Sequence, residues 1–93
     1  MLTMNKAIKL LDEAYAMQRE NAASHARTTG LRDVLYDAAV HSDYEKLIEV
    51  ADELSAMREK RIANLQAVAN RFAKIKEAGF LIADVKMAKA RKG

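Results

Sequence analysis

The sequence predicts an all-α protein, a small helical bundle of three main helices followed by a short one. No proline and only three glycines interrupt its 93 residues, and apolar residues recur at helical spacing over long stretches. No run of alternating polar and apolar residues indicates a strand. A chain of this length suits one domain with one modest core, so we expect residues 1–93 to form a single helical domain whose last few residues fray.

The first two helices are expected over residues 4–28 and 31–41. An apolar face begins at Met4 and continues to Ala26, and a face this wide suits a helix with two neighbours. Gly30 is expected to end the first helix, since glycine readily adopts the left-handed conformation found at helix C-termini. The turns beside the second helix are short, so consecutive helices must pack against each other.

The third helix, residues 43–78, is the longest element. Ser42 is expected to cap its first turn together with Glu45, and Gly79 is expected to close its last turn. After Gly79, residues 80–90 are expected to form the short C-terminal helix. An apolar stripe runs along the third helix and consists of Leu47, Val50, Ala51, Leu54, Met57, Ile62, Leu65, Val68, Ala69, Phe72 and Ile75.

An unbroken helix over residues 43–78 is too long for a compact domain of this size. It measures about 54 Å at about 1.5 Å per residue, whereas a compact chain of this length is only about 32 Å across. Either the helix kinks and folds back, or a second chain covers its protruding apolar strip. We expect the second chain, and hence a homodimer.

Two arginines interrupt the apolar stripe of the third helix. Arg61 projects from the centre of the stripe, and Arg58 lies near its edge. Long basic side chains lay their stems over apolar neighbours while the guanidinium reaches water, and this is the interpretation we favour. The alternatives are a break in the helix near these residues, or an acidic group from elsewhere that meets Arg61.

Charge is distributed unevenly along the sequence. Residues 42–59 carry two basic and six acidic groups, whereas residues 60–93 carry nine basic and two acidic groups. Acids near the start of a helix and bases near its end complement the helix dipole, which explains part of this pattern. Two further interpretations stay open: antiparallel association of two copies of the long helix, and nucleic-acid binding by the basic C-terminal third. The candidate nucleic-acid-binding residues are Arg71, Lys74, Lys76, Lys86, Lys89, Arg91 and Lys92.

Motifs that carry catalysis or cofactor binding do not occur in this sequence. It has no G-x-S-x-G, no glycine-rich phosphate loop and no H-E-x-x-H, and it has no cysteine for a thiolate metal site. Asp33, Asp37 and His41 share one helix flank, but the helix dipole explains a histidine near a helix C-terminus. We therefore expect no catalytic, cofactor-binding or metal-binding residues, no cofactor and no small-molecule substrate.

These observations predict a non-catalytic protein-binding or regulatory module, of adaptor or inhibitor type, that acts through an apolar helix face and as a homodimer. Arginine and large apolar side chains commonly dominate such contacts. The residues expected to bind a partner are Arg58, Arg61, Leu65, Phe72 and Ile75. No segment has the roughly 20 apolar residues that span a bilayer, and the N-terminus lacks the apolar core of a secretory signal, so we expect a cytoplasmic protein without membrane contact. Nucleic-acid binding by the basic third is the alternative function.

Overall fold

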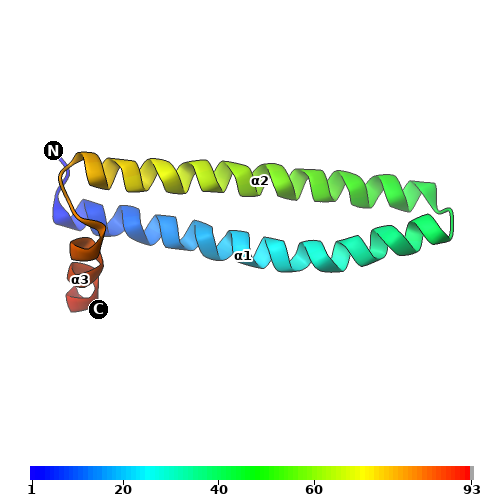
Figure 1. Cartoon of the computed structure of the whole chain (residues 1–93), viewed down its shortest axis with the longest axis horizontal. Coiled ribbons are helices and arrows are strands. Elements are labelled where there is room, and N and C mark those ends of the chain that lie inside the picture. Colours follow the sequence, from blue (N-terminus) through cyan, green and yellow to red (C-terminus); the bar gives the residue numbers. More distant parts are fainter. Residues whose placement is uncertain (93) are drawn as a thin grey trace. The chain divides into compact units, whose positions relative to one another are not determined.

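The computed structural model describes residues 1–92, and the side chains of residues 1–91. It contains three helices, α1 (Met4–Val40), α2 (Tyr44–Glu77) and α3 (Ile82–Lys92), and no strand within that range (Figure 1). The prediction of an all-α fold is confirmed, as are the long helix α2 and the short C-terminal helix α3. None of the three helices has an apolar stretch that could cross a bilayer, as far as the described residues reach.

The predicted break at Gly30 is wrong, because α1 continues through this residue to Val40. Gly30 has helical backbone rather than the positive φ of a helix-ending glycine, and nothing lies within 4 Å of the position its Cβ would take. A glycine inside a helix costs only about 0.5–1 kcal/mol relative to alanine, which the neighbouring helix-forming residues and the packing against α2 outweigh. The two helices expected over residues 4–28 and 31–41 are therefore one.

The turn between α1 and α2 is built around Ser42, which has a positive φ of 53°. The Ser42 amide donates to the carbonyl of Ala39 (3.2 Å), and the Asp43 amide donates to the carbonyl of Ala38 (2.9 Å). This pair of bonds is the Schellman arrangement that closes a helix, with Ser42 in the place usually taken by glycine.

The expected capping of α2 by Ser42 is wrong, and the capping residue is Asp43. The Lys46 amide donates to Oδ1 of Asp43 at 3.2 Å. An N-terminal cap needs extended backbone, which Ser42 does not have because it closes α1 in the left-handed conformation. At the other end of α2, Gly79 has a φ of 88° and closes the helix as expected.

Contacts divide the chain into two compact units, each of which includes part of α1 and part of α2. Unit 1 comprises Met1–Arg19 and the chain from Asn64 onward, including α3, and unit 2 comprises Glu20–Ala63. Within each unit the two helix segments run antiparallel (Figure 1). The single domain expected from the sequence stays a prediction.

In both units, the residues of α1 and α2 that pack between the two helices follow one another along each helix at alternating spacings of three and four, as in a coiled coil. We call these residues the seam and label them positions a and d of a heptad. All of them are buried or half-buried. On α1 the seam consists of Ala7, Leu10, Ala14, Met17, Asn21, Ser24, Thr28, Leu31, Leu35 and Ala38. On α2 it consists of Leu47, Val50, Leu54, Met57, Arg61, Asn64, Val68, Arg71 and Ile75.

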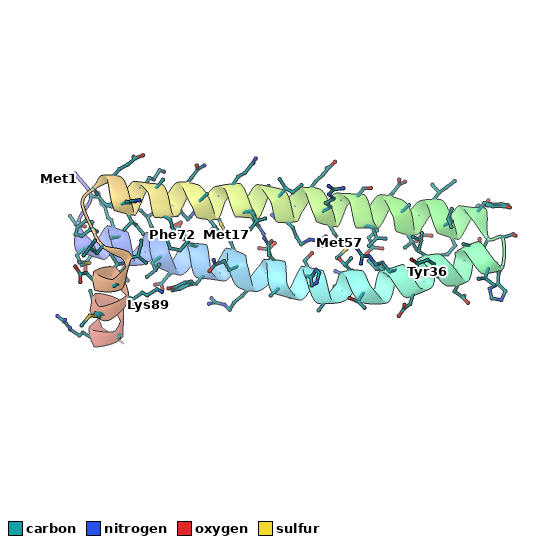
Figure 2. All side chains as sticks on the ribbon, viewed as in Figure 1. Met1, Met17, Tyr36, Met57, Phe72 and Lys89 are labelled. Atoms are coloured by element: carbon teal, nitrogen blue, oxygen red, sulfur yellow. The ribbon has the colours of Figure 1, made fainter. Side chains whose placement is uncertain are left out.

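Unit 1 contains the main apolar core. Its fully or nearly fully buried cluster consists of Ala7, Ile8, Leu11, Ile75 and Val85. Because Val85 belongs to α3, the short helix is part of this core. Lys89 of α3 extends toward α1, where it pairs with Asp12 and lies 5.1 Å from the ring centre of Tyr15 (Figure 2).

Unit 2 has a thin and partly polar interior. Its buried residues are Thr28, Ala38 and Val50, and Met57 adds a half-buried side chain between the helices (Figure 2). Part of α1 packs against α2 in both units. The exposed apolar residues of α2 are therefore not explained by an end of α2 that extends beyond its partner helix, as the sequence had suggested. They are exposed because α2 has a second apolar stripe beside the seam, and α1 covers only the first.

Candidate protein-binding surface

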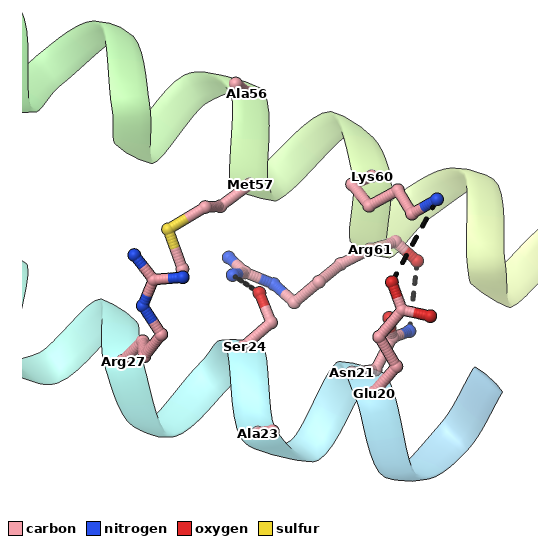
Figure 3. A pocket seen from close by; sticks show the side chains of 9 residues that line it. All are labelled: Glu20, Asn21, Ala23, Ser24, Arg27, Ala56, Met57, Lys60 and Arg61. Carbon is pink, nitrogen blue, oxygen red and sulfur yellow. Dashed lines mark hydrogen bonds and ion pairs between the residues drawn. The ribbon is translucent and has the colours of Figure 1, made fainter. Parts of the chain in front are cut away.

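Arg61 lies in the seam of unit 2 and is held by polar groups of α1. Its Nη1 donates to Oγ of Ser24 (3.0 Å) and to Oγ1 of Thr28 (2.9 Å), while its carbonyl accepts a bond from Nδ2 of Asn21 (3.1 Å; Figure 3). The helix does not break here, and the groups that meet Arg61 are hydroxyls rather than an acid. The arginine therefore extends across the seam to hydroxyls of α1 and stays half-buried at the edge of two surface hollows. Its hydrogen bonds to α1 were not part of the interpretation favoured from the sequence.

One side of unit 2 carries charges that are paired within the chain. We call it the charged flank; it is formed by position g of both helices. Arg27 pairs with Glu53 at 3.0 Å, and Lys60 lies 4.0 Å from Glu20. A hollow of about 380 Å³ lies on this side, bordered by Arg27, Lys60 and their neighbours (Figure 3). Because its charged groups already have partners, this hollow offers little to a ligand.

The opposite side of unit 2, which we call the open flank, consists of positions b and e of both helices. On α2 these positions form a second stripe with spacings of three and four, made of Tyr44, Ile48, Ala51, Ser55, Arg58 and Ile62. The three large apolar side chains are well exposed, Tyr44 by 68%, Ile48 by 60% and Ile62 by 46%. Apolar stripes of this kind commonly mark interaction sites.

Three arginines meet at a hollow of about 230 Å³ on the open flank. Its lining residues are Thr28, Arg32, Leu54, Ser55, Arg58 and Arg61, and they include no carboxylate. Arg32 and Arg58 form no hydrogen bond or ion pair within the described part of the chain. The open flank thus combines exposed apolar side chains with guanidinium groups that lack an acidic partner.

The five residues expected to bind a partner lie in different environments. Arg58 and Arg61 meet at the arginine hollow, and Leu65, in unit 1, is 59% exposed. Phe72 is half-buried against the core of unit 1, and Ile75 is fully buried in it. Because Ile75 has no exposed surface, we leave it out of the proposed binding surface.

The basic residues considered for nucleic acid all belong to unit 1, and two of them are engaged within the chain. Nε of Arg71 donates to Oε2 of Glu13 at 3.1 Å, and Lys89 pairs with Asp12. The exposed ones are Lys74, Lys76, Lys86 and Arg91. The side chain of Lys92 lies outside the described residues.

The sequence interpretation missed Tyr44, Ile48 and Arg32 as surface candidates. A separate count at heptad spacing would have resolved the broad stripe on α2 into a seam and a second stripe, and would have placed Tyr44 and Ile48 on the latter. Arg32 could not have been found in this way. Its meeting with Arg58 depends on α1 continuing past Gly30 and on the register between the helices.

Of the residues considered for a metal, His41 and Asp37 form a local contact at the end of α1. Nδ1 of His41 lies 2.9 Å from the carbonyl oxygen of Asp37 and, when protonated, donates to it. No group of three or more potential ligands converges among the described residues.

Comparison with known proteins finds no matching family model, curated protein or solved structure.

Proposed function

We propose that this chain is a non-catalytic protein-binding module, of adaptor or inhibitor type, and that the open flank of unit 2 is its binding surface. The observation that carries the proposal is the exposed stripe of Tyr44, Ile48 and Ile62 on one side of α2. Covering these side chains would remove apolar area from water, at roughly 25 cal/mol per Å². Arg58, beside them, is of the residue type that often anchors such contacts.

The test is affinity capture from the source cell with three baits. Ile48→Glu places a charge in the centre of the stripe, and Met87→Glu removes a comparable apolar side chain, 55% exposed, from α3. We expect a protein retained by the unchanged bait and by Met87→Glu, lost with Ile48→Glu, and resistant to nuclease. Equal recovery with all three baits would contradict the proposed surface.

A second copy of the chain is the other partner to consider. By sequence, unit 1 carries ten basic and four acidic side chains, whereas unit 2 carries six basic and nine acidic. These opposite excesses favour association between unit 1 of one copy and unit 2 of another, which supports the predicted homodimer. Light scattering tests it directly: a dimer has twice the 10.4 kDa mass of one chain and should dissociate as salt rises. A mass of one chain at all concentrations would rule it out.

Nucleic-acid binding by unit 1 is the second candidate function. It is favoured by the basic excess of that unit and by the exposure of Lys74, Lys76, Lys86 and Arg91. Such binding should weaken steeply between about 50 and about 200 mM salt. A gel-shift titration at these two concentrations separates it from an apolar protein interface, whose affinity should hardly change.

A further inference from the structure

Unit 1 shows how positions b and e of α1 are covered where a third helix packs, while on α2 Phe72 is half-buried and Leu65 stays exposed. On α1, Ile8 and Leu11 are buried and Tyr15 is half-buried, and Val85 of α3 belongs to the same core cluster. The covering helix also supplies a charge that matches the surface, since Lys89 pairs with Asp12. A helix that covers this flank therefore contributes both an apolar side chain and a complementary ion.

In unit 2 the same heptad positions have no covering helix. Every b and e position of unit 2 is exposed, including Tyr36 on α1 at 70% and Ile48 on α2 at 60%. The apolar side chains at this flank occur on both helices, as they do in unit 1. Unit 2 thus presents a flank suited to a helix that the unit does not itself contain.

The charge of this flank specifies what the covering helix must carry. Arg32, Arg58 and Arg61 line one hollow, without a carboxylate among its lining residues. Guanidinium groups bind carboxylates through strong, often bidentate, charge-assisted hydrogen bonds. A helix that covers Ile48 and Ile62 would bring its own side chains over this hollow, and aspartate or glutamate would give the arginines their partners.

A second copy in twofold symmetry does not meet this requirement. If the twofold axis passes beside the hollow, the arginines of the two copies face each other. If unit 2 pairs instead with unit 1 of the other copy, the unit with ten basic and four acidic side chains lies over the arginines. Like charges placed together in this way disfavour a complex. The occupant that fits is a helix of another protein.

We infer that the open flank of unit 2 binds an amphipathic helix that carries acidic residues beside its apolar stripe. Ile48 and Ile62 contact the stripe, and Arg32 and Arg58 bind the carboxylates. Arg61 is fixed by Ser24 and Thr28 and holds the positive charge of the hollow in place. This inference rests on the proposed function and specifies the chemistry of the partner.

The test uses synthetic helical peptides of about 18 residues, five turns, with apolar residues at i, i+3, i+4 and i+7. One peptide has glutamate and its twin has lysine at the flanking positions. Fluorescence anisotropy measures their affinity for the full chain, for Arg32→Gln/Arg58→Gln, for Ile48→Glu and for the control Lys46→Gln/Lys60→Gln. The control removes two cations from the charged flank of the same unit.

We expect the glutamate peptide to bind the full chain at least about tenfold more tightly than the lysine peptide. The Arg32→Gln/Arg58→Gln variant should lose about tenfold for the glutamate peptide only, Ile48→Glu should abolish binding, and the control should match the full chain. Equal binding of the two peptides, with both dependent on Ile48, would overturn the acidic partner and leave the proposed surface standing. If neither peptide binds, the inference is also overturned. The proposed function would then still be tested separately by the affinity-capture experiment.

A further arm tests a free anion by titrating inorganic phosphate alone. We expect phosphate to bind weakly, and to compete with the glutamate peptide only at high concentration. Tight phosphate binding that survives in Ile48→Glu, with no peptide bound, would overturn the helix and identify the arginine hollow as a small-anion site.

Discussion

Units 1 and 2 are built from the same two helices and the same heptad spacing, yet they differ in what covers them. In unit 1, α3 packs on one side of the pair, and the cluster around Leu11, Ile75 and Val85 is closed. In unit 2, the seam includes Asn21, Ser24, Thr28 and Arg61, and one flank carries exposed apolar side chains. The seam spacing pairs two helices, but a third element decides which of the remaining apolar residues are hidden.

The two units also differ in how much buried apolar side chains stabilise them. The largest fully buried side chains, Leu11, Ile75 and Val85, all belong to unit 1, whereas the buried apolar residues of unit 2 are Ala38 and Val50. Segments with few buried apolar contacts open at lower free energy than the core of the same protein. Unit 2 is therefore expected to be the less stable part, which would suit the partner-binding surface proposed for it.

The largest effect is expected when one core side chain in each unit is truncated and the losses in the free energy of unfolding are compared. Ile75→Ala should lower the free energy of unfolding by about 3 kcal/mol, because it leaves a cavity in a closed core. Leu54→Ala should cost only about 1–2 kcal/mol, since Leu54 is half-buried and truncation there leaves water access instead of a cavity. Urea denaturation measures both, and a larger loss for Leu54→Ala would reverse the comparison.

A smaller effect is expected when the seam of unit 2 is made apolar. Arg61→Leu should raise the free energy of unfolding by up to about 1 kcal/mol, because apolar residues that replace a half-buried charged network are often neutral or stabilising. Thr28 keeps a partner in this variant, since its hydroxyl donates to the carbonyl of Ser24 at 3.0 Å. Thermal and urea denaturation check the change. A loss above about 1 kcal/mol would show that the polar seam stabilises unit 2.

The smallest expected effects come from two backbone positions of unit 2. Ser42→Gly should raise the free energy of unfolding by about 0.5–1 kcal/mol, because glycine adopts the left-handed conformation without steric cost. Gly30→Ala should add a similar or slightly smaller amount, since the helix interior favours alanine and there is open space for the added methyl group. Denaturant midpoints of the two variants test this. Destabilisation by Gly30→Ala would mean that this part of α1 is not helical in solution.

Helical spacing and the absence of proline were enough to predict the all-α fold, the bounds of α2 and its closure at Gly79. The role of Gly30 could not be predicted in the same way. The free-energy cost of one glycine inside a helix is smaller than the stabilisation from packing against α2, so the helix continues. Ser42 carries no residue-type signal for the left-handed conformation it adopts. Two of the three arginines at the hollow, Arg58 and Arg61, could be found in the sequence because they interrupt the apolar stripe. Arg32 could not, because its position depends on the pairing of two helices.

Native-state hydrogen exchange tests the central claim most directly, because it reports the opening of each unit in the intact chain. We expect amides of α1 and α2 in unit 1, such as those of Leu11 and Ile75, to exchange at least about tenfold more slowly than those of Leu31 and Leu54 in unit 2. That ratio corresponds to about 1.4 kcal/mol between the two opening reactions. Equal protection of the two units, or slower exchange in unit 2, would contradict the account of a closed core in unit 1 and a thin, partly polar interior in unit 2.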